Sequence, residues 1–180
     1  LESTCKLLGL EVGIISNIYN NTYTIEHFFP IGIDLFKGQR FELGNTYCSI
    51  TLDTGDVFSV NHMAESAFNV HPCYGTFHLE SYIGIPLEVD GKLYGTINFS
   101  SSQPKKDGFS KYDHQLVTLL GKWTGGVIQR QHIARELEKE KELYKLISNN
   151  SAELICLHDP DGTFKFVSKS SIHILGYLPE

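Results

Sequence analysis

The 180-residue sequence predicts an α+β fold, with a central antiparallel sheet of five to six strands, flanking helices and a long C-terminal helix. Three features predict this fold. Strand-like apolar runs follow one another in hairpin order, and short helical segments lie before and between them. A charged helical run then continues for roughly 40 residues after Ser110. Because strands in hairpin order pair with their neighbours, an antiparallel sheet with the helices packed on one face is expected.

The strongest hairpin signal lies in SYIGIPLEVDGKLYGTINFSS, residues 81–101. Two β-rich runs flank Asp90-Gly91, and both turn residues tolerate the positive φ of a tight hairpin turn. A first hairpin is expected over residues 10–29, with its turn at Asn20-Asn21. Residues 30–40 are expected to form a loop, and residues 57–61 a short strand.

Helices are expected at residues 1–8, ended by Gly9, and at residues 47–52, with Asn45 as N-cap. Residues 62–74 are expected to combine a short helix with an irregular loop. The long helix begins at Ser110, which forms a capping box with Asp113. Its apolar stripe is interpreted as the face against the sheet; the stripe consists of Leu116, Leu119, Leu120, Trp123, Val127 and Ile128.

Three glycines, Gly121, Gly125 and Gly126, lie inside this helix, and each costs about 1 kcal/mol relative to alanine. They are interpreted either as sites of close packing or as a soft joint between the domain and a linker.

Beyond Arg130 the apolar positions thin to Ile133, Leu137, Tyr144 and Ile147, whose spacing fits the a/d seam of a coiled coil. Glu140 interrupts this seam. We expect two copies of the helix to pair in parallel, with Trp123, Ile133, Leu137 and Tyr144 as the dimer and signalling residues. A solvated single helix is the alternative.

The expected organisation is therefore a domain over residues 1–130, a helical coiled-coil linker over 131–149 and the truncated beginning of a second domain over 150–180. The chain is expected to be part of a longer protein, because it begins without Met and ends abruptly.

Composition excludes several classes of partner. A formal net charge of −6 argues against nucleic acid as a partner. The sequence contains no apolar run long enough to span a bilayer. Four cysteines without C-x-x-C spacing indicate reduced thiols, so a cytoplasmic location is expected.

Three segments resemble the GAF family of small-molecule sensory domains: TYCSITLDTGDVFSVNH, SYIGIPLEVDGKLYGTINFSS and FSKYDHQLVTLLGKWTGGVIQR. The tail from Leu143 to Glu180 resembles the opening of a PAS domain, with Asp159-Pro160-Asp161-Gly162 as the turn between two strands and Ser168–Gly176 as a short helix. Together the resemblances imply a signalling protein such as a sensor histidine kinase or a diguanylate cyclase. The output domain would lie outside these residues, because His132 lacks the setting of a phosphoacceptor.

The GAF resemblance implies a ligand cavity between the sheet and the segment 58–82. The candidate ligand-binding residues are Phe58, His62, His71, Cys73, Tyr74, His78, Tyr82 and Asn98. Buried polar groups are costly unless they are paired, so these side chains either line a pocket or face solvent from a loop.

No cofactor or metal is predicted. His62, His71, Cys73 and His78 could supply donors to zinc or haem, but their spacing matches no recurrent zinc pattern. A covalent bilin at Cys73 is disfavoured, because His71 and not Cys73 stands near the position of the attachment cysteine in phytochrome-like domains. A cyclic nucleotide is disfavoured because the Asn-Lys of that signature is missing.

The predicted function is a sensory module that binds a small molecule or relays a conformational change through a dimeric helix to a downstream output domain. One alternative is a free methionine-R-sulfoxide reductase that uses Cys48 and Cys73 as thiols. Against it, no third cysteine lies near Gly38, and Tyr82, Asn98 and Ser100 replace the assisting carboxylates. Another alternative is a ligand-free dimeric spacer. No catalytic residue is predicted.

Overall fold

The computed structural model describes residues 1–30 and 34–178, so residues 31–33 of the expected loop lie outside the described residues. The chain forms two compact units, residues 1–129 and residues 130–180, which are described separately below.

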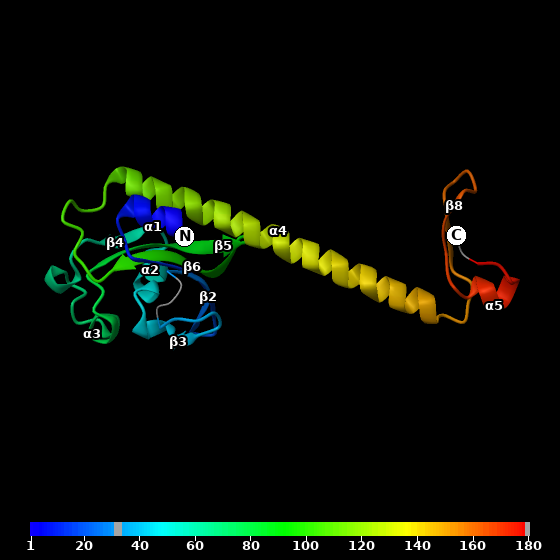
Figure 1. The fold of residues 1–180 in the computed structure, drawn as a ribbon, viewed down its shortest axis with the longest axis horizontal. Helices are drawn as coiled ribbons and strands as arrows, with labels where there is room; N and C mark the ends of the chain where they lie inside the picture. The colour runs from blue at the N-terminus through cyan, green and yellow to red at the C-terminus, as the bar shows by residue number, and fades with distance from the viewer. Residues whose placement is uncertain (31–33, 179–180) are drawn as a thin grey trace. The chain divides into compact units, whose positions relative to one another are not determined.

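The first unit contains a six-stranded sheet in the order β3-β2-β1-β6-β5-β4 (Figure 1). All neighbouring strands are antiparallel, which confirms the predicted α+β class. The strands are β1 (Val12–Tyr19), β2 (Thr22–Phe29), β3 (Arg40–Glu42), β4 (Phe58–Val60), β5 (Ser81–Val89) and β6 (Lys92–Ser101).

Both predicted hairpin turns are confirmed. Asn20 and Asn21 have φ values of 47° and 62°, and Asp90 and Gly91 have values of 53° and 67°. Asn, Asp and Gly adopt this left-handed region at the lowest cost, which explains the chain reversal at these positions. Strand β3 was not predicted, because three residues are too few to show an alternating pattern.

The helices of this unit are α1 (Glu2–Leu8), η1 (Leu43–Asn45), α2 (Cys48–Thr54), η2 (Met63–Glu65), α3 (Pro72–Phe77) and the first part of α4 (Lys111–Asn150). The predicted N-cap at Asn45 is wrong. Asn45 ends a 3₁₀ turn, its Nδ2 donates to Glu42 Oε2 at 3.3 Å, and α2 begins only at Cys48. Helix α3 begins at Pro72, whose missing N–H suits the first helical position.

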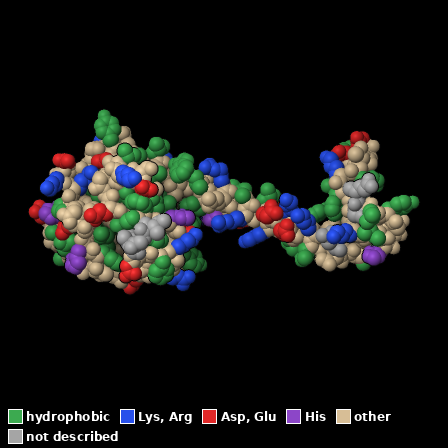
Figure 2. Space-filling model, in the orientation of Figure 1, with side chains coloured by type: hydrophobic (Ala, Val, Ile, Leu, Met, Phe, Trp, Pro, Cys, Tyr) green, Lys and Arg blue, Asp and Glu red, His purple; other side chains and the backbone are tan. Residues whose placement is uncertain are grey.

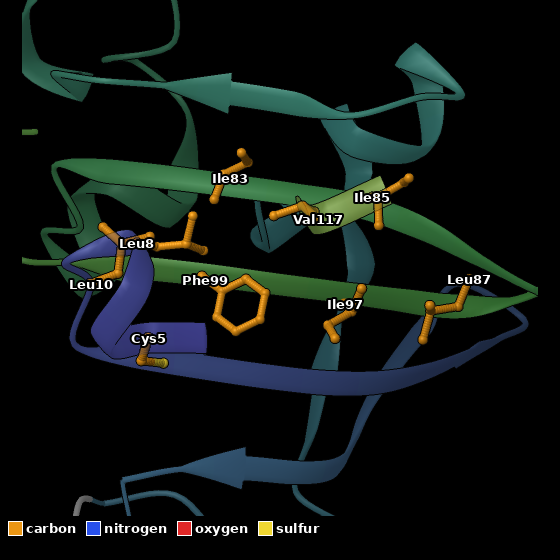
Figure 3. Packing of buried hydrophobic residues seen from close by; sticks show 9 residues of the cluster. All are labelled: Cys5, Leu8, Leu10, Ile83, Ile85, Leu87, Ile97, Phe99 and Val117. Atoms are coloured by element: carbon orange, nitrogen blue, oxygen red, sulfur yellow. The ribbon is translucent and has the colours of Figure 1, made fainter. Parts of the chain in front are cut away.

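Strand β6 separates two packed layers. Successive side chains of a strand point to opposite faces, so Ile97 and Phe99 lie on one side of the sheet with Cys5 and Leu8 of α1 (Figure 3). Val117 of α4 completes this cluster. Helices α1 and α4 therefore cover one face, whereas α2 packs on the other, so the expectation of helices on one face only is wrong (Figure 1).

Helix α4 begins as predicted. Ser110 N–H donates to Asp113 Oδ2 at 2.8 Å, and Asp113 N–H donates to Ser110 Oγ at 3.2 Å. These reciprocal bonds form the expected capping box, which satisfies donors that the first turn leaves without helical partners.

The predicted sheet-facing stripe of α4 is partly wrong. Leu119 and Trp123 are 67% and 62% exposed, whereas Val117 is fully buried. The helix approaches β5 through its glycines: a Cβ on Gly121 would lie 2.9 Å from Ile85 Cγ2, and a Cβ on Gly125 would collide with the carbonyl oxygen of Glu88. This close approach turns Leu119 and Trp123 away from the sheet.

The second unit comprises the remainder of α4 followed by β7 (Cys156–His158), β8 (Phe164–Val167) and α5 (Ser171–Leu175). The two strands pair antiparallel. Asp159 N–H donates to Thr163 O at 2.9 Å, which closes the predicted turn. The Tyr144 and Phe166 rings lie 5.6 Å apart, so this part of α4 packs against β8.

Charged side chains of both signs are interspersed along the second half of α4, with apolar side chains among them (Figure 2). Over residues 1–30 and 34–178, the search for a helix both long and apolar enough to cross a membrane finds none.

The glycine contact yields a stability prediction. Gly125→Ala should destabilise the first unit by about 1–3 kcal/mol, because the new methyl group overpacks the contact with β5. Gly75→Ala is the matched control: Gly75 lies in α3 with open space around its Cβ position, so this change should raise stability by up to about 1 kcal/mol. Urea unfolding followed by circular dichroism measures both, and equal effects would contradict the close packing.

Candidate functional site

A cavity of about 220 Å³ lies on the α2 side of the sheet. Strands β1, β2, β5 and β6 supply one wall, and the segments around α2 and α3 supply the other. Its lining consists of Val12, Ile14, Tyr23, Ile25, Leu35, Phe41, Thr46, Tyr47, Cys48, Cys73, Phe77, Leu79, Tyr82, Asn98 and Ser100.

Strand alternation places Asn98 and Ser100 on this wall, two residues apart on the same face of β6. Gly84 pairs with Asn98 across the sheet, and a Cβ at Gly84 would lie 2.5 Å from Tyr82 Oη. Gly84 therefore leaves the space that the Tyr82 ring occupies beside Asn98.

The inner end of the cavity is a cluster of hydrogen bonds around the Cys48 thiol. Thr96 Oγ1 donates to Cys48 Sγ at 3.1 Å, and Asn98 Nδ2 donates to it at 3.3 Å. Tyr82 Oη lies 3.6 Å from the same sulfur and shares a 2.7 Å hydrogen bond with Thr51 Oγ1. These bonds satisfy polar groups that would be costly to bury alone.

Burial keeps the titratable groups of the cavity neutral. It raises the pKa of the Cys48 thiol, and it raises the pKa of Tyr23 and Tyr82 well above the ordinary value for tyrosine. The same cause raises the pKa of Tyr47 and brings that of Cys73 to about 12. Both thiols are therefore protonated at neutral pH and are poor nucleophiles.

Three of the predicted ligand-binding residues, Cys73, Tyr82 and Asn98, line this cavity. The other five lie outside its lining. Phe58 packs edge-on against the Phe68 ring at 5.1 Å, and His71 caps α3, with its Nδ1 accepting from Cys73 N–H at 3.2 Å.

Two of the remaining three, Tyr74 and His62, lie in a polar network around Glu80. Tyr74 Oη donates to Glu80 Oε1 at 2.7 Å, and His62 Nε2 lies 3.6 Å from Glu80 Oε2. Although burial opposes it, the Tyr74 hydrogen bond and the Ala64 N–H lower the pKa of Glu80. His78 ends α3 with φ 50°, and its ring lies 6.1 Å from that of Tyr74. A ligand role for the five residues outside the lining stays a prediction.

The main residues missed by sequence reasoning are Tyr23 and Ile25 of β2, Ile14 of β1 and Tyr47 before α2. The alternation of apolar and polar residues along β2 already placed Tyr23 and Ile25 on the same face of the strand, so a signal for these two residues was available in the sequence. A wall formed by the sheet was expected, but nothing in the sequence indicated that β1 and β2 would be the strands that form it with β5 and β6.

Within residues 1–30 and 34–178, no group of three or more His, Cys, Asp or Glu side chains is placed so that it could hold a metal ion.

Comparison with known families identifies the fold. Residues 1–128 match the family model of the GAF domain, so the chain belongs to the GAF family. A comparison with curated proteins finds no significant match.

Solved structures agree with this assignment. The GAF domain of an Acinetobacter phosphoenolpyruvate-protein phosphotransferase is 14% identical, with 75% of this chain and 80% of that chain covered and a TM-score of 0.61. The blue-light-absorbing form of the PixJ GAF domain from Thermosynechococcus elongatus is 13% identical, with 78% and 86% covered and a TM-score of 0.60. The GAF domain of a two-component sensor histidine kinase from Bacillus halodurans is 18% identical, with 74% and 91% covered and a TM-score of 0.58. At these identities the likeness establishes the fold.

The burial of the thiols yields a prediction for their reactivity. Cys5, Cys48 and Cys73 are buried and Cys156 is exposed, so one thiol per chain should react rapidly with Ellman's reagent in the native protein. All four should react in denaturant. In Cys156→Ser, the matched control, the rapid phase should disappear. Rapid reaction of two or more thiols in the native protein would show that the cavity wall is open.

Proposed function

We propose that this GAF domain is the sensory module of a multi-domain signal-transduction protein, of the two-component sensor kinase type. It binds a small molecule in the cavity and relays the change through a paired α4 to a following PAS domain and an output domain. The observation that carries the proposal is the position of β6, which contributes Asn98 and Ser100 to the cavity and Ile97 and Phe99 to the core under α4.

The close contacts between the sheet and α4 leave little space for α4 to move relative to β5. Gly121 and Gly125 lie against β5, and Gln129 Nε2 donates to Asp90 Oδ1 at the β5–β6 turn. Protein interiors are close-packed and transmit small displacements. A ligand that moves β5 or β6 therefore also biases the position of α4, and couplings of this kind typically amount to about 1–3 kcal/mol.

The exposed face of α4 supports pairing with a second copy. Its apolar positions Leu119, Trp123, Ile133, Leu137 and Tyr144 are each about half to two-thirds exposed and share the spacing of one heptad seam. In a parallel pair on that seam, Glu136 of one helix would lie beside Lys141 of the other, which are opposite charges. Glu140 remains a charge at a seam position.

The neighbouring parts of the protein are also inferred. The β7–β8 pair with its Asp159–Gly162 turn supports the beginning of a PAS domain. Four unpaired cysteines in the described residues suit a reducing compartment, which supports a cytoplasmic location for this part of the protein.

The alternatives receive less support. A free methionine sulfoxide reductase requires a thiolate, whereas burial raises the pKa of Cys48 and Cys73. Its zwitterionic substrate would also need charged partners, and none of the residues described in the cavity lining is Lys, Arg, His, Asp or Glu. A ligand-free spacer would leave unexplained the polar groups that face the cavity.

Pairing of α4 gives a direct test of the relay. Ile133→Asp combined with Leu137→Asp should convert a dimer into a monomer, because two charges would enter an apolar seam. Light scattering after size-exclusion chromatography measures the mass of both proteins.

The matched control is Arg135→Asp combined with Lys139→Asp, which introduces two aspartates at positions outside the seam and should leave the protein dimeric. A monomeric wild type, or a dimer that survives Ile133→Asp with Leu137→Asp, would refute the proposed pairing.

A further inference from the structure

The cavity lining contains no charged side chain among its described residues. Among the described lining residues there is no Lys, Arg, His, Asp or Glu, and the titratable ones are three tyrosines and two cysteines. Burial raises the pKa of all five, so they are uncharged at neutral pH. A charged ligand would lie in this space without a counter-charge, which is strongly unfavourable. The lining therefore favours a neutral ligand.

The volume limits the size of the ligand. An apolar cavity of about 150 Å³ in another protein binds benzene, and the cavity here measures about 220 Å³. It therefore accommodates one six-membered ring with a small substituent.

Most polar groups at the cavity already have hydrogen-bond partners inside the protein. Tyr82 Oη bonds with Thr51, Tyr47 Oη donates to Leu79 O at 3.3 Å, and Thr46 Oγ1 donates to Leu43 O at 2.9 Å. These groups shape the cavity, but their hydrogen bonds are already made.

Asn98 and Ser100 are the exceptions. Asn98 is only 4% exposed, and its Nδ2 donates to Cys48 Sγ at 3.3 Å and Tyr23 Oη at 3.4 Å, yet its Oδ1 accepts no hydrogen bond from any described residue. Ser100 is 3% exposed, and its Oγ likewise has no partner in the described part of the chain. Both residues line the cavity. Neither oxygen is among the fully buried side-chain atoms that lack a partner, so both are open to the cavity, where a ligand that supplies a donor can bond to Asn98 Oδ1.

We propose that the cavity binds a neutral, mainly apolar molecule of about one substituted ring that carries a single hydroxyl or N–H group. That group donates to Asn98 Oδ1, and its own oxygen or nitrogen lies within reach of Ser100 Oγ. This assignment deepens the proposed sensory function and rests on it, because it names the chemical class of the signal.

Three ring compounds of nearly equal size test the assignment on the full 180-residue chain. Cyclohexanol offers a donor, cyclohexanone offers only an acceptor, and cyclohexanecarboxylate is an anion. Binding is followed by NMR of isoleucine methyl groups, because Ile14 and Ile25 line the cavity and Ile83 lies in the core on the other face of the sheet. Cyclohexanol should shift Ile14 and Ile25 and bind at least about fivefold more tightly than cyclohexanone. Cyclohexanecarboxylate should not bind.

Variants identify the responsible groups. Asn98→Leu should abolish the preference for cyclohexanol over cyclohexanone, whereas Ser100→Ala should weaken the binding of both compounds by a similar factor. Ser101→Ala is the matched control, because Ser101 is a buried serine on the same strand outside the cavity lining, and it should change neither affinity. If Asn98→Leu does not fold, the comparison of the three compounds on the wild-type protein still tests the proposed ligand class.

Two results would overturn the assignment. One is comparable binding of the carboxylate, and the other is no shift of Ile14 and Ile25 with any compound, which would mean that the cavity holds only water.

The sensory function is tested separately by the fluorescence of Trp123, the single tryptophan of the chain. If cyclohexanol binds as expected but the fluorescence of Trp123 does not change, the ligand class stands and the relay through α4 is refuted.

Discussion

Strand β6 presents two different surfaces, and the other features of the domain depend on that difference. Its residues at even positions, Thr96, Asn98 and Ser100, carry polar side chains into the cavity side, and Ile97 and Phe99 carry apolar side chains into the core under α1 and α4. Because one strand contributes to both layers, occupancy of the cavity and the position of α4 share the same backbone. We therefore propose that a change on the cavity face displaces the α4 face as well.

The glycines of α4 have a related role. Helix interiors lose about 1 kcal/mol for each glycine relative to alanine, so Gly121 and Gly125 weaken the helix locally. In return the helix backbone approaches β5 closely, and the apolar residues Leu119 and Trp123 are left exposed for another contact. The two glycines thus explain both the close contact of α4 with β5 and the exposure of Leu119 and Trp123 on the opposite face of the helix.

The sequence predicted the fold better than the site, for physical reasons that particular residues show. Asn20-Asn21, Asp90-Gly91 and the Ser110–Asp113 capping box act locally, and each formed as expected. The cavity lining, in contrast, combines side chains that are far apart in the sequence. Ile14 of β1 and Ile25 of β2 line the same wall as Asn98 of β6 only because the strands lie in the order β2-β1-β6. The exposure of Leu119 was missed for a similar reason, because the distance between α4 and β5 is set by glycines and not by the apolar pattern.

The GAF domain described here thus combines a neutral cavity with a helix held tightly against the same sheet. Hydrogen exchange of the α4 amides over residues 117–129, measured with and without saturating cyclohexanol, tests this coupling most directly. We expect the ligand to change exchange in this segment of α4 as well as around the cavity. Changes confined to β1, β2, α2 and α3, with α4 unaffected, would contradict it.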